Sequence, residues 1–169
     1  MAARMNPFVN LQKRSIQLPK DCKDLIDVLR QPRARGIVRE RGELAHIEHC
    51  LSRLLQSAAK RKALFILSLD GQAACVLAHH DGVLAVTVWF ECRNSVREEA
   101  VRGLFVEAGI NPTMDDVKSS AGVPMRGLAY PLPTVAPRAA QLTAELMRRA
   151  YGVTEEASLV FLYDERDAA

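Results

Sequence analysis

The chain has 169 residues, of which 49% are hydrophobic, 25% charged and 5% aromatic. This composition is typical of an ordinary globular domain with one hydrophobic core, and it excludes a fibrous protein or a fully disordered chain. The net charge of +3 is uneven, since residues 1–41 carry 10 Lys and Arg against 4 Asp and Glu, whereas residues 42–169 carry 13 against 16. A basic leading segment therefore precedes a slightly acidic body.

No targeting or membrane segment is expected. Residues 1–20 contain no continuous apolar stretch followed by a small-residue cleavage site. Four basic and no acidic residues in this stretch would suit an organellar presequence, but it holds a single serine, and Pro7 interrupts a helix there. Because no apolar run approaches the roughly 20 residues that span a bilayer, we expect a cytoplasmic protein whose four cysteines are reduced.

The leading segment is predicted as an extended arm over residues 1–20, a short helix capped by Asp21, and a linker over residues 31–41. Pro32 and Gly36 make this linker a flexible connector. It also holds the candidate anion contacts, which are Arg33, Arg35, Arg39 and Arg41. We therefore divide the chain into a basic arm, short helix and linker over residues 1–41 and a single α+β domain over residues 42–169.

The domain is predicted to begin with a helix over residues 42–62, where apolar side chains recur on one face at helical spacing. Three strands follow, joined by turns at Asp70-Gly71 and Asp81-Gly82, because Asp-Gly between apolar runs is a strong hairpin signal. These strands span residues 63–69, 73–80 and 83–92.

The second half of the domain is predicted to hold two helices and two or three strands. The capping box Ser95-x-x-Glu98 opens a helix over residues 95–108, and a third helix begins near Pro137 and ends at Gly152. The strands span residues 113–119, 125–132 and 158–163. The expected fold class is α+β, an antiparallel sheet built on a three-stranded meander and packed against helices, in the order α-β-β-β-α-β(β)-α-β.

Both faces of the predicted meander are apolar. A two-residue loop at Asp81-Gly82 pairs residue i with residue 163 − i, which places Leu77 and Val86 on one face and Val76 and Trp89 on the other. A sheet with one solvated face would alternate apolar with polar residues, so we expect cover on both sides. Three candidates could cover the second face: the third helix, the leading arm or a second copy of the protein. The candidate partner contacts on this face are Phe65, Leu67, Val76 and Trp89.

Two groups of side chains offer the ligand chemistry of a zinc site. His46, His49 and Cys50 lie on the first predicted helix, and Cys75 and His79 lie on the second strand. The two histidines of the helix point away from its apolar stripe, whereas the strand residues point into an apolar sheet face. The groups are therefore not expected to converge, and we predict exposed histidines and a buried structural cysteine, with no metal and no cofactor.

No catalytic residue is predicted either. The acidic pairs Glu98-Glu99, Asp115-Asp116 and Glu155-Glu156 are adjacent in sequence at helix starts or loops, where they favour helix dipoles and solubility. The nucleophile-elbow, P-loop, His-Glu-x-x-His and Gly-x-Gly-x-x-Gly motifs are missing from the sequence. Cys22 has two interpretations, a reactive thiol beside two lysines or a buried member of an apolar helix stripe, and we favour the second.

The order helix, three-stranded meander, helix, strands, helix resembles the type III secretion chaperone-like fold and its bacterial relatives over residues 42–152. The clearest points are the two Asp-Gly hairpin signals and the helix exit Tyr151-Gly152-Val153. The resemblance implies homodimerisation and binding of a partner polypeptide, with no catalytic residues.

We therefore expect a non-enzymatic chaperone-like or adaptor-like module that binds itself and an unidentified protein. The alternative is a nucleic-acid-associated protein that uses the basic segment. Phe8 is the only aromatic residue there that could stack on a base, so such binding would be weak and salt-sensitive.

Overall fold

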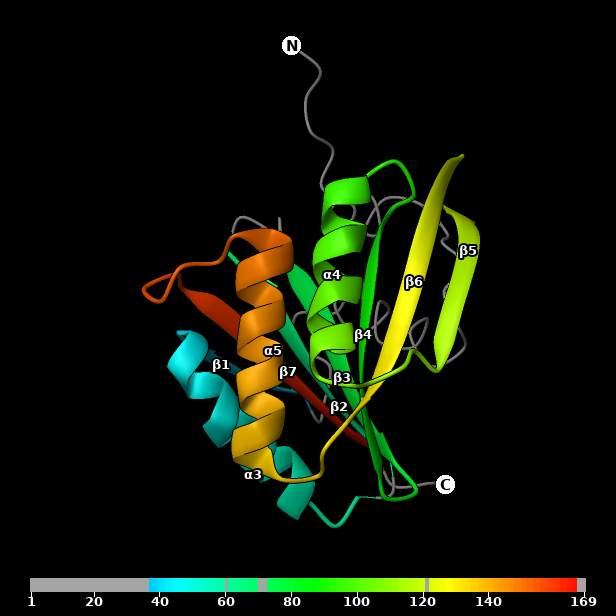
Figure 1. Cartoon of the computed structure of the whole chain (residues 1–169). Coiled ribbons are helices and arrows are strands. Elements are labelled where there is room, and N and C mark those ends of the chain that lie inside the picture. The colour runs from blue at the N-terminus through cyan, green and yellow to red at the C-terminus, as the bar shows by residue number, and fades with distance from the viewer. Residues whose placement is uncertain (1–36, 60, 70–72, 121, 167–169) are drawn as a thin grey trace.

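The computed structural model describes residues 37–59, 61–69, 73–120 and 122–166, so the short predicted helix and the extended arm lie outside the described residues. In chain order the elements are β1 (Ile37–Gly42), the 3-10 helix η1 (Leu44–His46), α3 (Ile47–Gln56), β2 (Arg61–Ser68), β3 (Ala74–His80), β4 (Val83–Glu91), α4 (Ser95–Glu107), β5 (Met114–Ser120), β6 (Val123–Leu132), α5 (Ala136–Tyr151) and β7 (Leu159–Arg166) (Figure 1).

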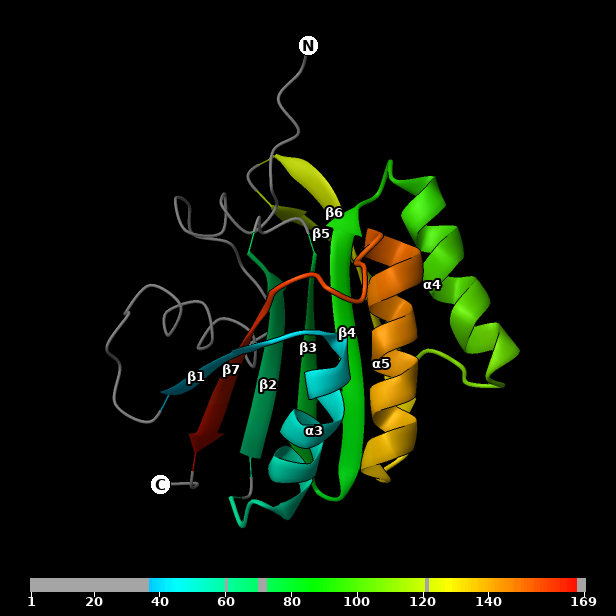
Figure 2. The ribbon, with the colours of Figure 1, turned by 90° about the vertical axis from the view of Figure 1, so that its left-hand side faces the viewer.

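The described strands form one antiparallel sheet in the order β1-β7-β2-β3-β4-β6-β5. The helices α3, α4 and α5 lie together on one face of this sheet, and α5 packs between the other two (Figure 2). The sheet contributes alternate side chains to this layer, since Leu84, Val86, Val88 and Phe90 of β4 are all buried against it. The predicted α+β class, with a meander packed against helices, is confirmed.

Two local predictions on the helices have different outcomes. Gly152 takes the left-handed conformation that ends α5, with a φ of 68°, and Pro137 lies in the first turn of that helix, as predicted. The cap of α4 was placed one residue too late. Asn94 rather than Ser95 is the N-cap, because its side-chain oxygen accepts a hydrogen bond from the Arg97 amide at 3.1 Å.

The predicted linker is wrong over its last residues. Residues 37–42 form the edge strand β1, so the predicted boundary between residues 41 and 42 cuts through a strand. The side chains of this strand alternate between the two faces of the sheet. Glu40 points toward the helices, while Arg39 and Arg41 point to the other face. Charged residues are common on edge strands, because they prevent pairing with further chains. In this sequence the charged residues made the strand resemble a polar linker.

The first predicted helix is shorter than expected. It comprises η1 and α3 and ends at Gln56, and Ser57 is extended with a ψ of 138°. Lys62, predicted as helical, belongs to β2 and is buried. Its ammonium group donates hydrogen bonds to the carbonyl oxygens of Leu55 and Ser57, which the helix leaves without amide partners at its end. No helix among the described residues is long and apolar enough to cross a membrane.

Replacing Gly152 with Ala is expected to lower the free energy of unfolding by about 1 kcal/mol, because an L side chain is disfavoured in the left-handed region. Gly103 is the matched control, since it lies inside α4 and an added Cβ would meet no atom within 4 Å. Gly103→Ala is expected to raise the same free energy by about 0.5 to 1 kcal/mol. Urea denaturation measures both changes. Equal shifts of the same sign would contradict the left-handed conformation assigned to Gly152.

Candidate protein-binding face

The face of the sheet opposite α3, α4 and α5 is called the open face here, because no described helix or strand lies on it (Figure 2). Residues directly opposite each other on antiparallel strands share a face. The register places Leu162 of β7 opposite Phe65 of β2, and Phe65 opposite Val76 of β3. Leu67 lies on the same side of β2, two residues further along. The register therefore brings three of the four predicted partner contacts together.

These apolar side chains differ in how much surface they leave to a partner. Phe65 and Val76 are 4% and 9% exposed, and with Ala63 and the partly buried Leu162 they form a second, smaller apolar cluster. Their role in this chain is packing, so little of their surface is free for contact. Leu67, Leu162 and Trp89 are partly exposed and make up the accessible apolar surface of the open face.

Trp89 of β4 is placed by its neighbours on β6 and β5. It lies opposite Gly127, where an added Cβ would come within 2.5 Å of two indole carbons, so only glycine admits the ring in this position. The ammonium of Lys118 lies 5.9 Å from the ring centroid, a cation–π distance. The indole N–H is buried and has no hydrogen-bond partner among the described residues.

Charged side chains mark the two edges of the open face. Arg39 and Arg41 of β1 are exposed at one edge, opposite Leu162 and Val160 of β7. Asp116 of β5 is exposed at the other edge. The remaining predicted anion contacts, Arg33 and Arg35, lie outside the described residues.

The histidines and cysteines follow the prediction in part. Cys75 is buried, as predicted, and burial raises the pKa of its thiol to about 12. Cys50 of α3 is fully buried as well, and burial raises the pKa of its thiol to about 11. Both thiols are therefore protonated and unreactive at neutral pH. His49 is exposed, whereas His46 is only partly exposed.

One residue of each acidic pair takes part in ion pairs beside the helices, namely Glu98, Asp115 and Glu155. Asp115 bridges Arg102 and Arg126 with contacts of 2.6 Å to each, and Glu98 lies 2.9 Å from Arg102. Hydrogen bonds from Arg102 and then Arg126 lower the pKa of Asp115. This carboxyl group stays ionised at neutral pH, which suits the pairing of β5 with α4 and does not suit a general acid.

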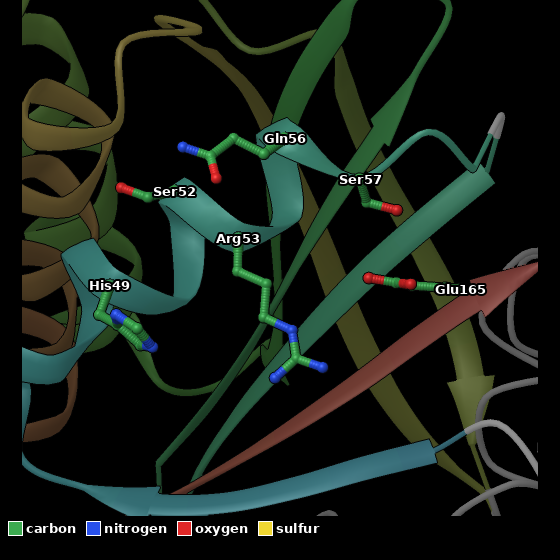
Figure 3. A pocket seen from close by; sticks show the side chains of 6 residues that line it. All are labelled: His49, Ser52, Arg53, Gln56, Ser57 and Glu165. Atoms are coloured by element: carbon green, nitrogen blue, oxygen red, sulfur yellow. The ribbon is translucent and has the colours of Figure 1, made fainter.

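A polar groove runs along α3 on the helix side of the molecule (Figure 3). His49, Ser52 and Gln56 project from α3, and Arg53 reaches from it toward β2 and β7. The remaining lining residues are Ser57 and Glu165. The groove is polar and separate from the open face, so it offers hydrogen bonds rather than apolar contact.

The sequence missed two members of the open-face cluster, Ala63 and Leu162. Leu162 was assigned to a terminal strand, but its place depends on β7 lying between β1 and β2. That pairing joins residues far apart in the chain, which no local pattern specifies. No protein-family model matches this chain, and neither a curated protein nor a solved structure matches it.

Gly127→Ala is expected to lower the free energy of unfolding by about 1 to 3 kcal/mol, because the new methyl group would collide with the indole of Trp89. The same change in a Trp89→Leu background is expected to be much less destabilising. Denaturation followed by circular dichroism completes this double-mutant cycle. An equal loss in both backgrounds would show that the indole is not what excludes a side chain at residue 127.

Proposed function

We propose that the protein is a non-enzymatic, cytoplasmic protein-binding module of the chaperone or adaptor type, and that it forms a homodimer through the open face. One observation supports this proposal: partly exposed Leu67, Leu162 and Trp89 lie on the same face as a small buried apolar cluster, and no described element covers that face. Apolar surface of this kind marks interaction sites on soluble proteins.

The open face is large enough for a stable interface with a second copy. Seven strands spaced about 4.8 Å apart give a width of about 29 Å, and eight residues of strand give a length of about 26 Å. The resulting area of about 750 Å² is close to the roughly 800 Å² that each partner buries in a stable interface.

The charges at the edges support the same occupant. A two-fold axis parallel to the strands places β1 of one copy over β5 of the other when two open faces meet. Arg39 and Arg41 of each copy then approach Asp116 of its partner, which is a complementary pairing, while the neighbouring Lys118 on the same side of β5 lies against Trp89 of its own sheet.

Sedimentation equilibrium of the full chain over the micromolar range tests the homodimer. Leu162→Glu introduces a charge into the apolar surface of the open face and is expected to weaken self-association by about tenfold or more. Val106→Glu is the matched control, because Val106 is 75% exposed on α4, on the opposite side of the sheet. This control is expected to leave self-association unchanged.

A wild-type chain that stays monomeric at every concentration would overturn the homodimer. Equal weakening by both variants would also overturn it, since the contact would then not depend on the open face. Circular dichroism of each variant establishes that it is folded before its association is compared.

The second candidate function is association with nucleic acid. Arg39 and Arg41 favour it, since both are exposed on one side of β1 and make no ion pair with a described residue. Filter binding of single-stranded and duplex DNA over a salt series separates the two proposals. Retention that falls steeply with salt, and falls further in Arg39→Ala/Arg41→Ala, supports nucleic acid, whereas no salt-dependent retention excludes it.

A further inference from the structure

Glu40, His46 and His49 form a side-chain cluster on the helix side of the molecule, away from the open face. They come from β1, η1 and α3, and each offers one ligand atom, all within 4.8 Å of one another. Among the described residues this is the only group of three histidine, cysteine or acidic side chains with such spacing. Two imidazoles and a carboxylate are a ligand set found in zinc sites.

The carboxylate of Glu40 is already oriented. The Arg53 guanidinium donates a 2.6 Å hydrogen bond to Oε1, and this leaves Oε2 directed at the imidazole of His46. Oε2 lies 3.1 Å from Nε2 of His46. Two ligand atoms that each lie about 2.0–2.1 Å from a tetrahedral ion are separated by about 3.3 Å, so this pair needs little movement. A hydrogen bond to the second oxygen is the usual support of a ligating carboxylate.

The imidazole of His46 is fixed on two further sides. It lies edge-on to Phe161, with the ring centroids 5.3 Å apart, and Phe161 is fully buried. It also packs on Gly42, where an added Cβ would come within 2.6 Å of the His46 side chain. Glycine at residue 42 therefore allows the ring to lie beside Glu40, and this close approach limits the conformations of His46 before any ligand binds.

His49 completes the cluster from the next turn of the helix. Its ring centroid lies 5.1 Å from that of His46, and its side chain is exposed. His49 also lines one end of the polar groove (Figure 3). A ligand bound beside this histidine would therefore have open space on the groove side.

We propose that Glu40, His46 and His49 bind one divalent transition-metal ion of the zinc type, through Oε2 of Glu40 and one nitrogen of each imidazole. A fourth tetrahedral position faces the groove and is filled by water or by an oxygen or nitrogen ligand from outside the chain. Arg53 holds the carboxylate from behind rather than ligating the ion. The ion joins edge strand β1 to α3, so binding stabilises the attachment of β1.

Isothermal titration of the full, reduced chain with Zn²⁺ tests the site, and Co²⁺ absorption reports its coordination. One ion is expected to bind per chain. His49→Ala removes an exposed ligand without disturbing the fold and is expected to weaken binding by about tenfold or more. His80→Ala is the matched control, because His80 is an exposed histidine on β3 that pairs with Asp81. It is expected to bind Zn²⁺ like the wild type.

Wild-type affinity in His49→Ala would overturn the proposal, and so would the lack of a stoichiometric complex. A thiolate-to-cobalt charge-transfer band would also overturn it, since the ion would then be bound by cysteine. His46→Ala gives a second comparison, and thermal unfolding without metal shows whether that variant is folded. These outcomes are independent of self-association, because the cluster lies on the other side of the sheet from the open face.

Discussion

The three described α-helices all pack on one face of the sheet, and this one-sided cover determines which side chains of each strand are buried. Side chains that point toward the helices form the main core, where Leu77, Val86 and Phe161 are fully or almost fully buried. Side chains that point the other way form a second surface with its own composition. Apolar residues occupy its centre and charged residues occupy its edges, so the burial pattern of each strand follows from its place in the sheet.

The position of β7 links the two sides of the molecule. This strand lies between β1 and β2, so Phe161 supports the helix layer while Leu162 adds to the apolar cluster of the open face. Strand β1 depends on β7 for its only pairing among the described strands. It also contacts α3 through Glu40, which pairs with Arg53 and His46. The proposed dimer surface and the proposed metal site are therefore built on opposite faces of the same pair of strands.

Local signals in the sequence were sufficient to predict much of the fold. The turn between β3 and β4 forms at Asp81 and Gly82, both with positive φ, and it sets the predicted register of 163 − i. Gly152 ends α5 for a similar local reason. Strand β1 could not be predicted, because its charged residues resemble a linker and its pairing with β7 joins distant segments. The same long-range pairing brings Glu40 beside His46, so spacing on one helix could not reveal that cluster.

The proposed homodimer depends on the open face, and the chain has an intrinsic fluorescent probe of this surface. Trp89 is the only tryptophan in the sequence and lies on this face. The most direct measurement is its fluorescence, with acrylamide quenching, as the full chain is diluted through the micromolar range. If two open faces are in contact, dilution of the wild type is expected to shift the Trp89 emission to the red and to increase its quenching. Leu162→Glu is expected to show the emission and quenching of the diluted wild type at every concentration. Emission and quenching that do not change with concentration would contradict contact between two open faces.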